Sequence, residues 1–155
     1  MGKKGLDRAI ISAAIVGILI STYALFVEMT AEANPEYKAY CDLAEKASCS
    51  SVLTSDFSKG FGLVAKGSPL ELPNCIYGIV FYCLMILMTT YDNVSVVQLQ
   101  FLTAVMSVLA CVYLAYLLLF VLRDFCVVCV STYFVNGGIA ALVYRKLNVV
   151  LKKCR

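Results

Sequence analysis

Two cysteines near the start of the last apolar run form the pattern that most directly suggests chemistry. Cys126 and Cys129 are separated by two residues within an uncharged stretch, residues 125–144. Two thiols three positions apart share a helix face and can close a small disulfide with modest adjustment. Tyr133 and Asn136 continue this face at helical spacing, so a dithiol, a phenol and an amide point the same way. Lipid offers such groups no partner, and we therefore expect the face to point into a helix bundle.

A second cysteine pair lies in the long polar connection after the first apolar run. Cys41 and Cys49 are eight residues apart. Residues 36–47 are predicted to form a short helix bearing Cys41, and on one straight helix the two cysteines would lie about 12 Å apart, beyond disulfide reach. Pairing therefore requires a bent or mobile loop, and mobility is what a carrier of electrons between two sites needs.

Two cysteine pairs on one side of a membrane allow three interpretations. A structural zinc site is disfavoured by the wide spacing of the loop pair and by the place of the other pair within a helix. Two inert structural disulfides would explain the pairing, and boundary cysteines can also serve as small apolar side chains. A redox relay explains pairing, position and the adjacent polar face together, because a thiolate of one pair can attack the disulfide of the other.

Within such a relay, depth in the membrane divides the roles of the helix pair. The helix N-terminus and Arg123 favour the thiolate form of the nearest sulfur, Cys126. Cys129 lies one turn deeper, where a membrane-soluble substrate would arrive. We therefore expect Cys126 to exchange with the loop pair and Cys129 to meet the substrate.

The composition indicates a membrane protein. Of 155 residues, 61% are hydrophobic and 15% are charged, and four long runs contain no Asp, Glu, Lys or Arg. A charge at the bilayer centre costs on the order of 2.5–3.5 kcal/mol on insertion scales, so these clean runs predict spanning helices. The predicted fold is all-α and integral to the membrane, a four-transmembrane-helix bundle with a lumenal loop and cap between helices one and two. Its single domain, residues 1–155, divides into helices at about 9–27, 72–91, 98–122 and 125–144, a loop and cap at 28–71 and a tail at 145–155.

Basic residues near both ends set the predicted orientation. One cluster flanks the first helix and the other follows the fourth: Lys3, Lys4 and Arg8, then Arg145, Lys146, Lys152, Lys153 and Arg155. The positive-inside rule then puts both termini in the cytosol and both cysteine pairs in the lumen. Because the basic residues gather at the termini, the net charge of +3 gives no indication of nucleic-acid binding.

Two short signals bear on location. Asn93-Val94-Ser95 is formally a glycosylation sequon, but the turn that holds it is predicted to be cytosolic, so Asn93 is predicted to stay unglycosylated. Lys152 and Lys153 have the spacing of the di-lysine retrieval signal of endoplasmic reticulum membrane proteins, although an ordinary basic flank explains them equally well. With that signal, the opposite face of the membrane is the oxidising lumen, where cysteine pairs belong.

The sequence also resembles the vitamin K epoxide reductase family. The matching pieces cover nearly the whole chain in the right order: Cys41-Asp42, Cys49-Ser50, Lys59-Gly60-Phe61-Gly62-Leu63-Val64, Asn74, Tyr77-Gly78, Phe81-Tyr82, Tyr113-Leu114-Ala115, Asp124-Phe125-Cys126-Val127-Val128-Cys129 and Thr132-Tyr133. The resemblance implies reduction of vitamin K epoxide and quinone in the endoplasmic reticulum membrane. The quinone would lie between the helices under the lumenal cap, as a substrate, with no tightly bound cofactor and no metal.

The resemblance also assigns roles to the cysteines. Cys129 would face the quinone, with Cys126 as its disulfide partner. Cys49 would exchange with Cys126, and Cys41 would receive electrons from a thioredoxin-like lumenal protein. Cys75 departs from the family pattern, because relatives usually carry a small polar residue such as serine at that place.

The substrate pocket is assigned in the same way. Asn74 and Tyr133 would donate hydrogen bonds to the quinone or epoxide oxygens, at the place where coumarin anticoagulants bind in this family. Phe61, Tyr77 and Phe81 match apolar positions of the pocket.

Two other functions remain open on the sequence. A quinone-linked generator of disulfides would run the same relay toward oxidation of client proteins, and epoxide turnover with a dithiol donor would separate the two. A four-helix scaffold with a disulfide-braced loop is the other, although claudin-type proteins carry a Trp-rich loop motif and this chain has no Trp. Activity retained after replacement of Cys126 and Cys129 would favour the scaffold.

Overall fold

The protein is all-helical in the part of the chain that the structure describes. A computed structural model describes residues 2–34, 36–42, 48–55, 57–64 and 67–153, and these contain no β-strand beyond one isolated bridge between Lys59 and Pro73. The elements are α1 (Lys3–Ala33), α2 (Cys49–Leu53), the 3₁₀ turn η1 (Gly60–Gly62), α3 (Asn74–Thr89), α4 (Val94–Tyr116), the π-helix η2 (Leu117–Leu122) and α5 (Val127–Lys153).

Three of these helices are long and apolar enough to cross a membrane. They are Lys3–Ala33, Val94–Leu122 and Val127–Lys153, while Asn74–Thr89 is a shorter apolar helix of 16 residues. Their outer surfaces carry large exposed apolar side chains, among them Leu19, Leu102, Phe120 and Phe134. Such a surface is costly in water and favourable in lipid.

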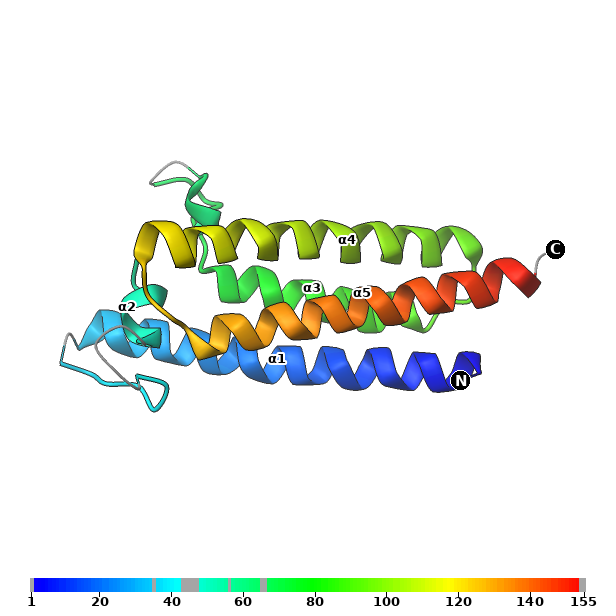
Figure 1. Ribbon diagram of the computed structural model, residues 1–155, viewed down its shortest axis with the longest axis horizontal. Coiled ribbons are helices and arrows are strands. Elements are labelled where there is room, and N and C mark those ends of the chain that lie inside the picture. The colour runs from blue at the N-terminus through cyan, green and yellow to red at the C-terminus, as the bar shows by residue number, and fades with distance from the viewer. Residues whose placement is uncertain (1, 35, 43–47, 56, 65–66, 154–155) are drawn as a thin grey trace.

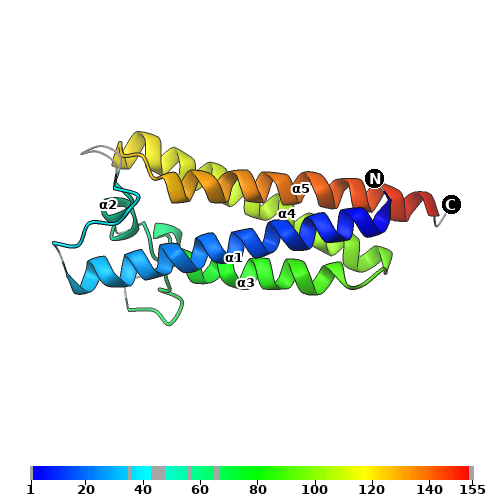
Figure 2. The ribbon, with the colours of Figure 1, turned by 90° about the horizontal axis from the view of Figure 1, so that it is seen from below.

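The long helices run side by side, and the connections gather at the two ends (Figure 1 and Figure 2). Both termini lie at one end. The connection between α1 and α3, which contains α2, lies at the other end together with the turn that leads into α5. α1 packs against α3 and α5, and α4 packs against α5. A buried cluster in the middle of the bundle joins α1, α3 and α5 through Ile10, Ala14, Tyr82, Met85, Ile139 and Val143.

Small residues let α1 and α3 approach closely. A Cβ atom at Gly17 would lie 2.4 Å from the Tyr82 ring, and one at Gly78 would lie 2.9 Å from Ser21 Oγ. Gly17 and Ser21 are spaced one turn apart on α1, so a single face of that helix receives its neighbour.

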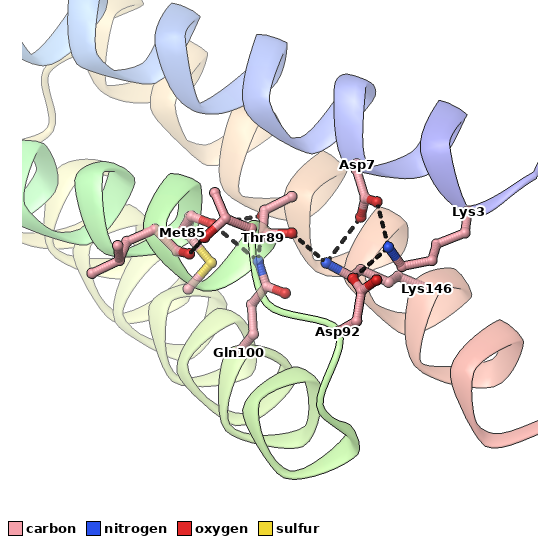
Figure 3. A network of polar contacts seen from close by, with 9 residues as sticks. Lys3, Asp7, Met85, Thr89, Asp92, Gln100 and Lys146 are labelled. Carbon is pink, nitrogen blue, oxygen red and sulfur yellow. Dashed lines mark hydrogen bonds and ion pairs between the residues drawn. The ribbon is translucent and has the colours of Figure 1, made fainter. Parts of the chain in front are cut away.

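A buried polar network closes the end of the bundle where the termini lie (Figure 3). Lys146 of α5 is fully buried, and its ammonium lies 2.9 Å from Asp7 Oδ1 and donates to the Thr89 carbonyl at 3.0 Å. Lys3 binds both Asp7 and Asp92. Lys146 is therefore an internal cation with a counter-ion on α1, and not the solvated flanking charge that counting basic residues suggests.

The network continues to α4 through a buried amide. Gln100 Nε2 donates to the Met85 carbonyl at 3.1 Å and to Thr89 Oγ1 at 2.7 Å (Figure 3). Thr89 thus contacts Gln100 by its hydroxyl and Lys146 by its carbonyl. Thus α1, α3, α4 and α5 all contribute to this end of the bundle.

Two predicted boundaries differ from the structure. α1 continues to Ala33, and α5 continues to Lys153 through the stretch expected to be a tail. The short helix expected over residues 36–47 is wrong for residues 36–42, which form turns and irregular chain; residues 43–47 lie outside the described part. The Asn34 side chain accepts the Glu36 N–H at 3.1 Å and Asp42 accepts the Ala39 N–H at 2.8 Å, which satisfies the backbone without a helix.

Candidate active site: two cysteine pairs and an apolar cavity

The loop cysteines are joined. Cys41 and Cys49 form a disulfide, and their Cα atoms lie 5.7 Å apart. Because residues 36–42 are not helical, Cys41 can fold back onto Cys49, as a bent loop was expected to allow. The Tyr23 hydroxyl of α1 lies 3.8 Å from Cys41 Sγ, which places the disulfide against the end of the bundle.

Asp42 organises the chain around this disulfide. Its carboxylate accepts the Ser48 hydroxyl at 2.9 Å and both the hydroxyl and the N–H of Ser50, at 2.6 and 3.0 Å, besides the Ala39 N–H. Partial burial raises the pKa of Asp42, but these hydrogen bonds outweigh it and hold the pKa at about 2. The carboxylate therefore stays charged at physiological pH and keeps Cys41 beside α2.

The loop pair and the helix pair are held against each other. The Ser48 N–H donates to Asp124 Oδ1 at 3.2 Å, so the residue before Cys49 is bonded to a residue two positions before Cys126. Cys49 and Cys126 are both fully buried and belong to one cluster with Val52 and Leu53 of α2, while Cys129 packs against its edge. The fold thus brings together all four cysteines that the sequence singled out.

Cys126 occupies the N-cap position of α5. Its sulfur accepts the Cys129 N–H at 3.2 Å, and its carbonyl accepts the Val130 N–H at 3.0 Å, the arrangement in which an N-cap side chain usually places an oxygen. The hydrogen bond from the Cys129 thiol, and those from the backbone N–H groups of Cys129 and Val128, lower the pKa of Cys126 despite its burial. Of the two cysteines, Cys126 is thus the one that favours the thiolate form. Neither Cys126 nor Cys129 is in a disulfide.

Arg123 was expected to favour the thiolate form of Cys126, but in the part of the chain that the structure describes it makes no contact of that kind with the sulfur. Its side chain is exposed, and its backbone ends η2 in the left-handed conformation at φ 52°. Among the described residues no hydrogen bond joins Arg123 to Cys126, and the negative charge of Asp124 acts against the thiolate. The donors that the structure shows for the Cys126 sulfur are backbone N–H groups and the Cys129 thiol.

A cavity of about 420 Å³ lies between the helices beneath the loop that contains η1. Its lining is mostly apolar and includes residues from α1, α3, α4 and α5. A cavity of this size and character suits a small apolar ring with few polar groups. Six of the nine predicted site residues line it, namely Phe61, Asn74, Tyr77, Phe81, Cys129 and Tyr133. The other three, Cys126, Cys41 and Cys49, are not part of the cavity wall.

Asn74 fastens the cap to the bundle. Its Oδ1 accepts the Phe61 N–H at 2.8 Å, its Nδ2 donates to the Phe57 carbonyl at 2.7 Å, and its own N–H donates to the Ser58 carbonyl at 2.7 Å. Phe61 has a φ of 58°, in the left-handed region that side chains rarely adopt, between Gly60 and Gly62 at φ 55° and 68°. Asn74 stabilises this turn and so places the Phe61 ring in the cavity wall. One hydrogen of Nδ2 remains for a ligand.

The two tyrosines of the cavity differ in how their hydroxyls are used. Tyr77 donates to the Leu70 carbonyl at 2.6 Å, and its ring centroid lies 5.5 Å from that of Phe61, so it also supports the cap. The Tyr133 hydroxyl has no hydrogen-bond partner among the described residues, although the side chain lines the cavity one turn below Cys129. Tyr133 is therefore the better placed of the two to donate to a ligand oxygen.

Sequence reasoning did not identify Glu28 as a residue of this site, and it assigned no role to Cys75. Glu28 of α1 is fully buried and accepts the Cys75 thiol at 3.2 Å and the Ser58 hydroxyl at 3.3 Å. Cys75 and Ser58 both line the cavity. The sequence shows Glu28 only as the first acidic residue after an apolar run. Glu28 is buried because α1 continues past the end of that run, which the sequence did not predict.

A metal site is incompatible with the loop pair as it stands. The sulfurs of Cys41 and Cys49 and a carboxylate oxygen of Asp42 lie within 4.8 Å of one another, as metal ligands would. The two sulfurs are bonded to each other, however, and a disulfide offers no thiolate to a cation. The cluster is therefore a disulfide with a hydrogen-bonded carboxylate beside it.

Comparison with known proteins confirms the resemblance. The model of the vitamin K epoxide reductase family matches residues 8–144. Vitamin K epoxide reductase complex subunit 1 of Rattus norvegicus is 36% identical over 144 residues, which cover 90% of this chain and 89% of the relative. The protein of the same name from Mus musculus is 38% identical over 137 residues, covering 86% and 85%. The chain therefore belongs to the vitamin K epoxide reductase family.

Proposed function

We propose that this protein reduces vitamin K 2,3-epoxide to the quinone, and the quinone to the hydroquinone, with electrons from thiols. The observation that carries the proposal is that Cys129 lines an apolar cavity while its backbone N–H donates to the Cys126 sulfur at 3.2 Å. The names of the rat and mouse relatives agree with this activity. Phe61, Phe81 and Tyr77 would surround the ring, and Tyr133 and Asn74 would donate hydrogen bonds to its oxygens.

The electrons would reach the cavity through the loop pair. A thioredoxin-like lumenal protein reduces the Cys41–Cys49 disulfide, and the Cys49 thiolate then attacks Cys126 of an oxidised helix pair. Cys41 resolves the mixed disulfide, which re-forms the loop disulfide and leaves Cys126 and Cys129 as a dithiol. A loop disulfide beside a reduced helix pair would be the state that follows this transfer.

The setting would be the endoplasmic reticulum membrane, with a four-helix bundle whose termini are cytosolic. Both termini lie at one end of the bundle, and both cysteine pairs lie at the other, which supports a lumenal active site under the cap. Coumarin-type inhibitors would occupy the same cavity as the quinone, because they too present a flat ring with oxygens to Asn74 and Tyr133.

The test is an epoxide-reductase assay of the protein in detergent with dithiothreitol, on the wild type and on Cys129→Ala. We expect turnover by the wild type and none by the variant, because no other sulfur of the helix pair faces the cavity. Quinone reduction without epoxide reduction would assign the protein to disulfide generation instead. Equal activity of both proteins would leave the helix pair with a structural role only.

A further inference from the structure

The reaction proposed above needs one proton more than a half-ionised dithiol carries. Reduction of the quinone adds two electrons and two protons, and reduction of the epoxide to quinone and water consumes the same number. With Cys126 as thiolate and Cys129 as thiol, the pair gives two electrons and closes its S–S bond but releases only one proton. The other proton must enter the cavity from elsewhere.

A buried acid stands next to the cavity at this place. Glu28 is fully buried, and its two carboxyl oxygens accept one donor each, Oε2 from the Cys75 thiol and Oε1 from the Ser58 hydroxyl. Both donors line the cavity. Ser58, Glu28 and Cys75 thus form a row joined by hydrogen bonds. A carboxyl exchanges protons far more readily than a hydroxyl, so Glu28 is the group in this row that can release a proton and take one back.

The same row opens toward water. A second, polar hollow of about 270 Å³ is lined mostly by residues of the connection between α1 and α3, and its wall includes Ser58, Glu32 and Lys59. Ser58 thus belongs to both walls, so that the hollow, Ser58, Glu28, Cys75 and the cavity follow one another in contact. The arrangement has the order of a proton path from the aqueous side into an apolar site.

The charges around Glu28 leave it without a cation of its own. Lys59 binds Glu32, one turn along α1, at 2.8 Å. α3 presents Cys75, and beyond it Cys126 and Cys129 face Cys75 from the start of α5. Lys59 and Glu32 neutralise each other at the surface, which leaves the Glu28 carboxyl held by two neutral donors.

We propose that Glu28, acting through the Cys75 thiol, supplies the second proton of the reduction and is reprotonated through Ser58. Glu28 accepts at both oxygens in the arrangement seen here, so a proton from the polar hollow first converts its carboxylate to the carboxylic acid. The Cys75 thiol then passes its proton to the substrate oxygen as the Cys126–Cys129 disulfide forms, and its sulfur takes the proton of Glu28, which returns the carboxylate. Cys75 touches the substrate, and Glu28 is a positioning residue that acts through it. This inference rests on the reductase function proposed above.

The test compares turnover with dithiothreitol across pH 6–9 for the wild type, Glu28→Gln, Cys75→Ala and Cys75→Ser. Glu28→Gln keeps the shape and a hydrogen-bonding side chain, and we expect it to lower kcat by about tenfold or more with little change in KM, because acid–base steps are worth at least that much. It should also flatten the pH profile. Cys75→Ala should behave like Glu28→Gln, whereas Cys75→Ser, which can still pass a proton, should recover most of the loss.

Glu36→Gln is the matched control, because Glu36 is an exposed carboxyl in the connection that follows α1. Bound inhibitor and the intact Cys41–Cys49 disulfide report whether each variant is folded. If Glu28→Gln does not fold, the difference between Cys75→Ala and Cys75→Ser decides. Wild-type kcat and pH profile in Glu28→Gln, or equal turnover of the two Cys75 variants, would overturn the inference. A wild type without any quinone or epoxide turnover would overturn the proposed function itself.

Discussion

Asn74 has two roles, because it lines the cavity and also holds the cap in place by hydrogen bonds. Its substitution is therefore expected to affect both ligand binding and the cap. The amide was expected to bind substrate, but it also carries two hydrogen bonds to the backbone of the cap. Tyr133, in contrast, has no partner among the described residues and can lose only a contact with ligand. The two substitutions therefore separate support of the cap from recognition of the ligand.

We expect Asn74→Ala to weaken inhibitor binding more than Tyr133→Phe does. Each lost hydrogen bond is worth about 0.5–1.5 kcal/mol, and an unsatisfied buried group costs about 1–3 kcal/mol. Tyr133→Phe should therefore lower affinity several-fold, and Asn74→Ala up to about a hundredfold, with the bundle still folded. Equilibrium binding of a coumarin to the detergent-solubilised variants measures this. Unchanged affinity in both variants would remove Asn74 and Tyr133 from the binding site.

The connection between α1 and α3 works as an element of its own. It carries its own disulfide, is held together by Asp42, and touches the turn before α5 through the hydrogen bond from Ser48 to Asp124. A folded protein donor cannot enter the cavity, so it has to deliver electrons to this connection. A small dithiol is not restricted in that way.

Replacing Cys41 or Cys49 by Ala should abolish turnover driven by a thioredoxin-like protein and leave dithiothreitol-driven turnover substantially intact. Replacing Cys126 or Cys129 should abolish both. In Cys41→Ala the resolving sulfur is missing, so a Cys49–Cys126 mixed disulfide should accumulate and be visible by peptide mass spectrometry. Loop and helix variants that respond alike to both reductants would contradict the relay.

Close packing of α1 on α3 gives a second prediction at this scale. A methyl group at Gly17 would overlap the Tyr82 ring at 2.4 Å, whereas one at Gly138 of α5 meets no atom within 4 Å. Gly17→Ala should destabilise the protein by about 1–3 kcal/mol through overpacking. Gly138→Ala should be neutral or slightly stabilising, since alanine favours helix over glycine. Thermal unfolding in detergent compares them, and equal midpoints would show that α1 and α3 separate without cost.

The whole molecule is closed at the end with the termini by the Lys146–Asp7 pair and its neighbours. Removing one partner of a buried pair costs about 3–5 kcal/mol because the other charge is left uncompensated. Asp7→Asn leaves the fully buried Lys146 without its carboxylate, whereas in Lys146→Met Asp7 still pairs with Lys3. Asp7→Asn should therefore unfold at markedly lower temperature than the wild type. Adding Lys146→Met to it should recover much of the loss, and a double variant as unstable as Asp7→Asn alone would refute this coupling.

Topology is tested with the sequon at Asn93. Asn93 caps α4, and its side chain accepts the Ser95 N–H at 3.0 Å. We expect no glycan there in microsomes, since this turn lies at the same end as the termini. Lys66→Asn creates a sequon with Gly67 and Ser68 in the opposite connection and should be glycosylated. The reverse pattern would place the cysteine pairs in the cytosol.

Patterns within short stretches of the sequence predicted the features that neighbouring residues determine. Uncharged runs gave helices, and the cysteine spacing together with the family motifs gave the residues that line the cavity or stand behind it. Partnerships between distant residues were out of reach: Lys146 reads as a flanking charge until Asp7 is placed beside it, and Glu28 reads as the start of a loop until Cys75 and Ser58 cover it. Asn74 was expected to bind ligand, because nothing in its neighbourhood shows that the cap returns to it.

The shortness of α3 matters for the lipid around it. Its 16 residues rise roughly 24 Å at 1.5 Å each, less than the roughly 30 Å of an average hydrocarbon core. In the proposed four-helix topology, acyl chains along this flank have to compress, and the penalty grows with bilayer thickness. The endoplasmic reticulum bilayer is a few ångströms thinner than the sterol-rich plasma membrane. Hydrophobic mismatch at one helix would thus favour residence in the thinner membrane, independently of any retrieval signal.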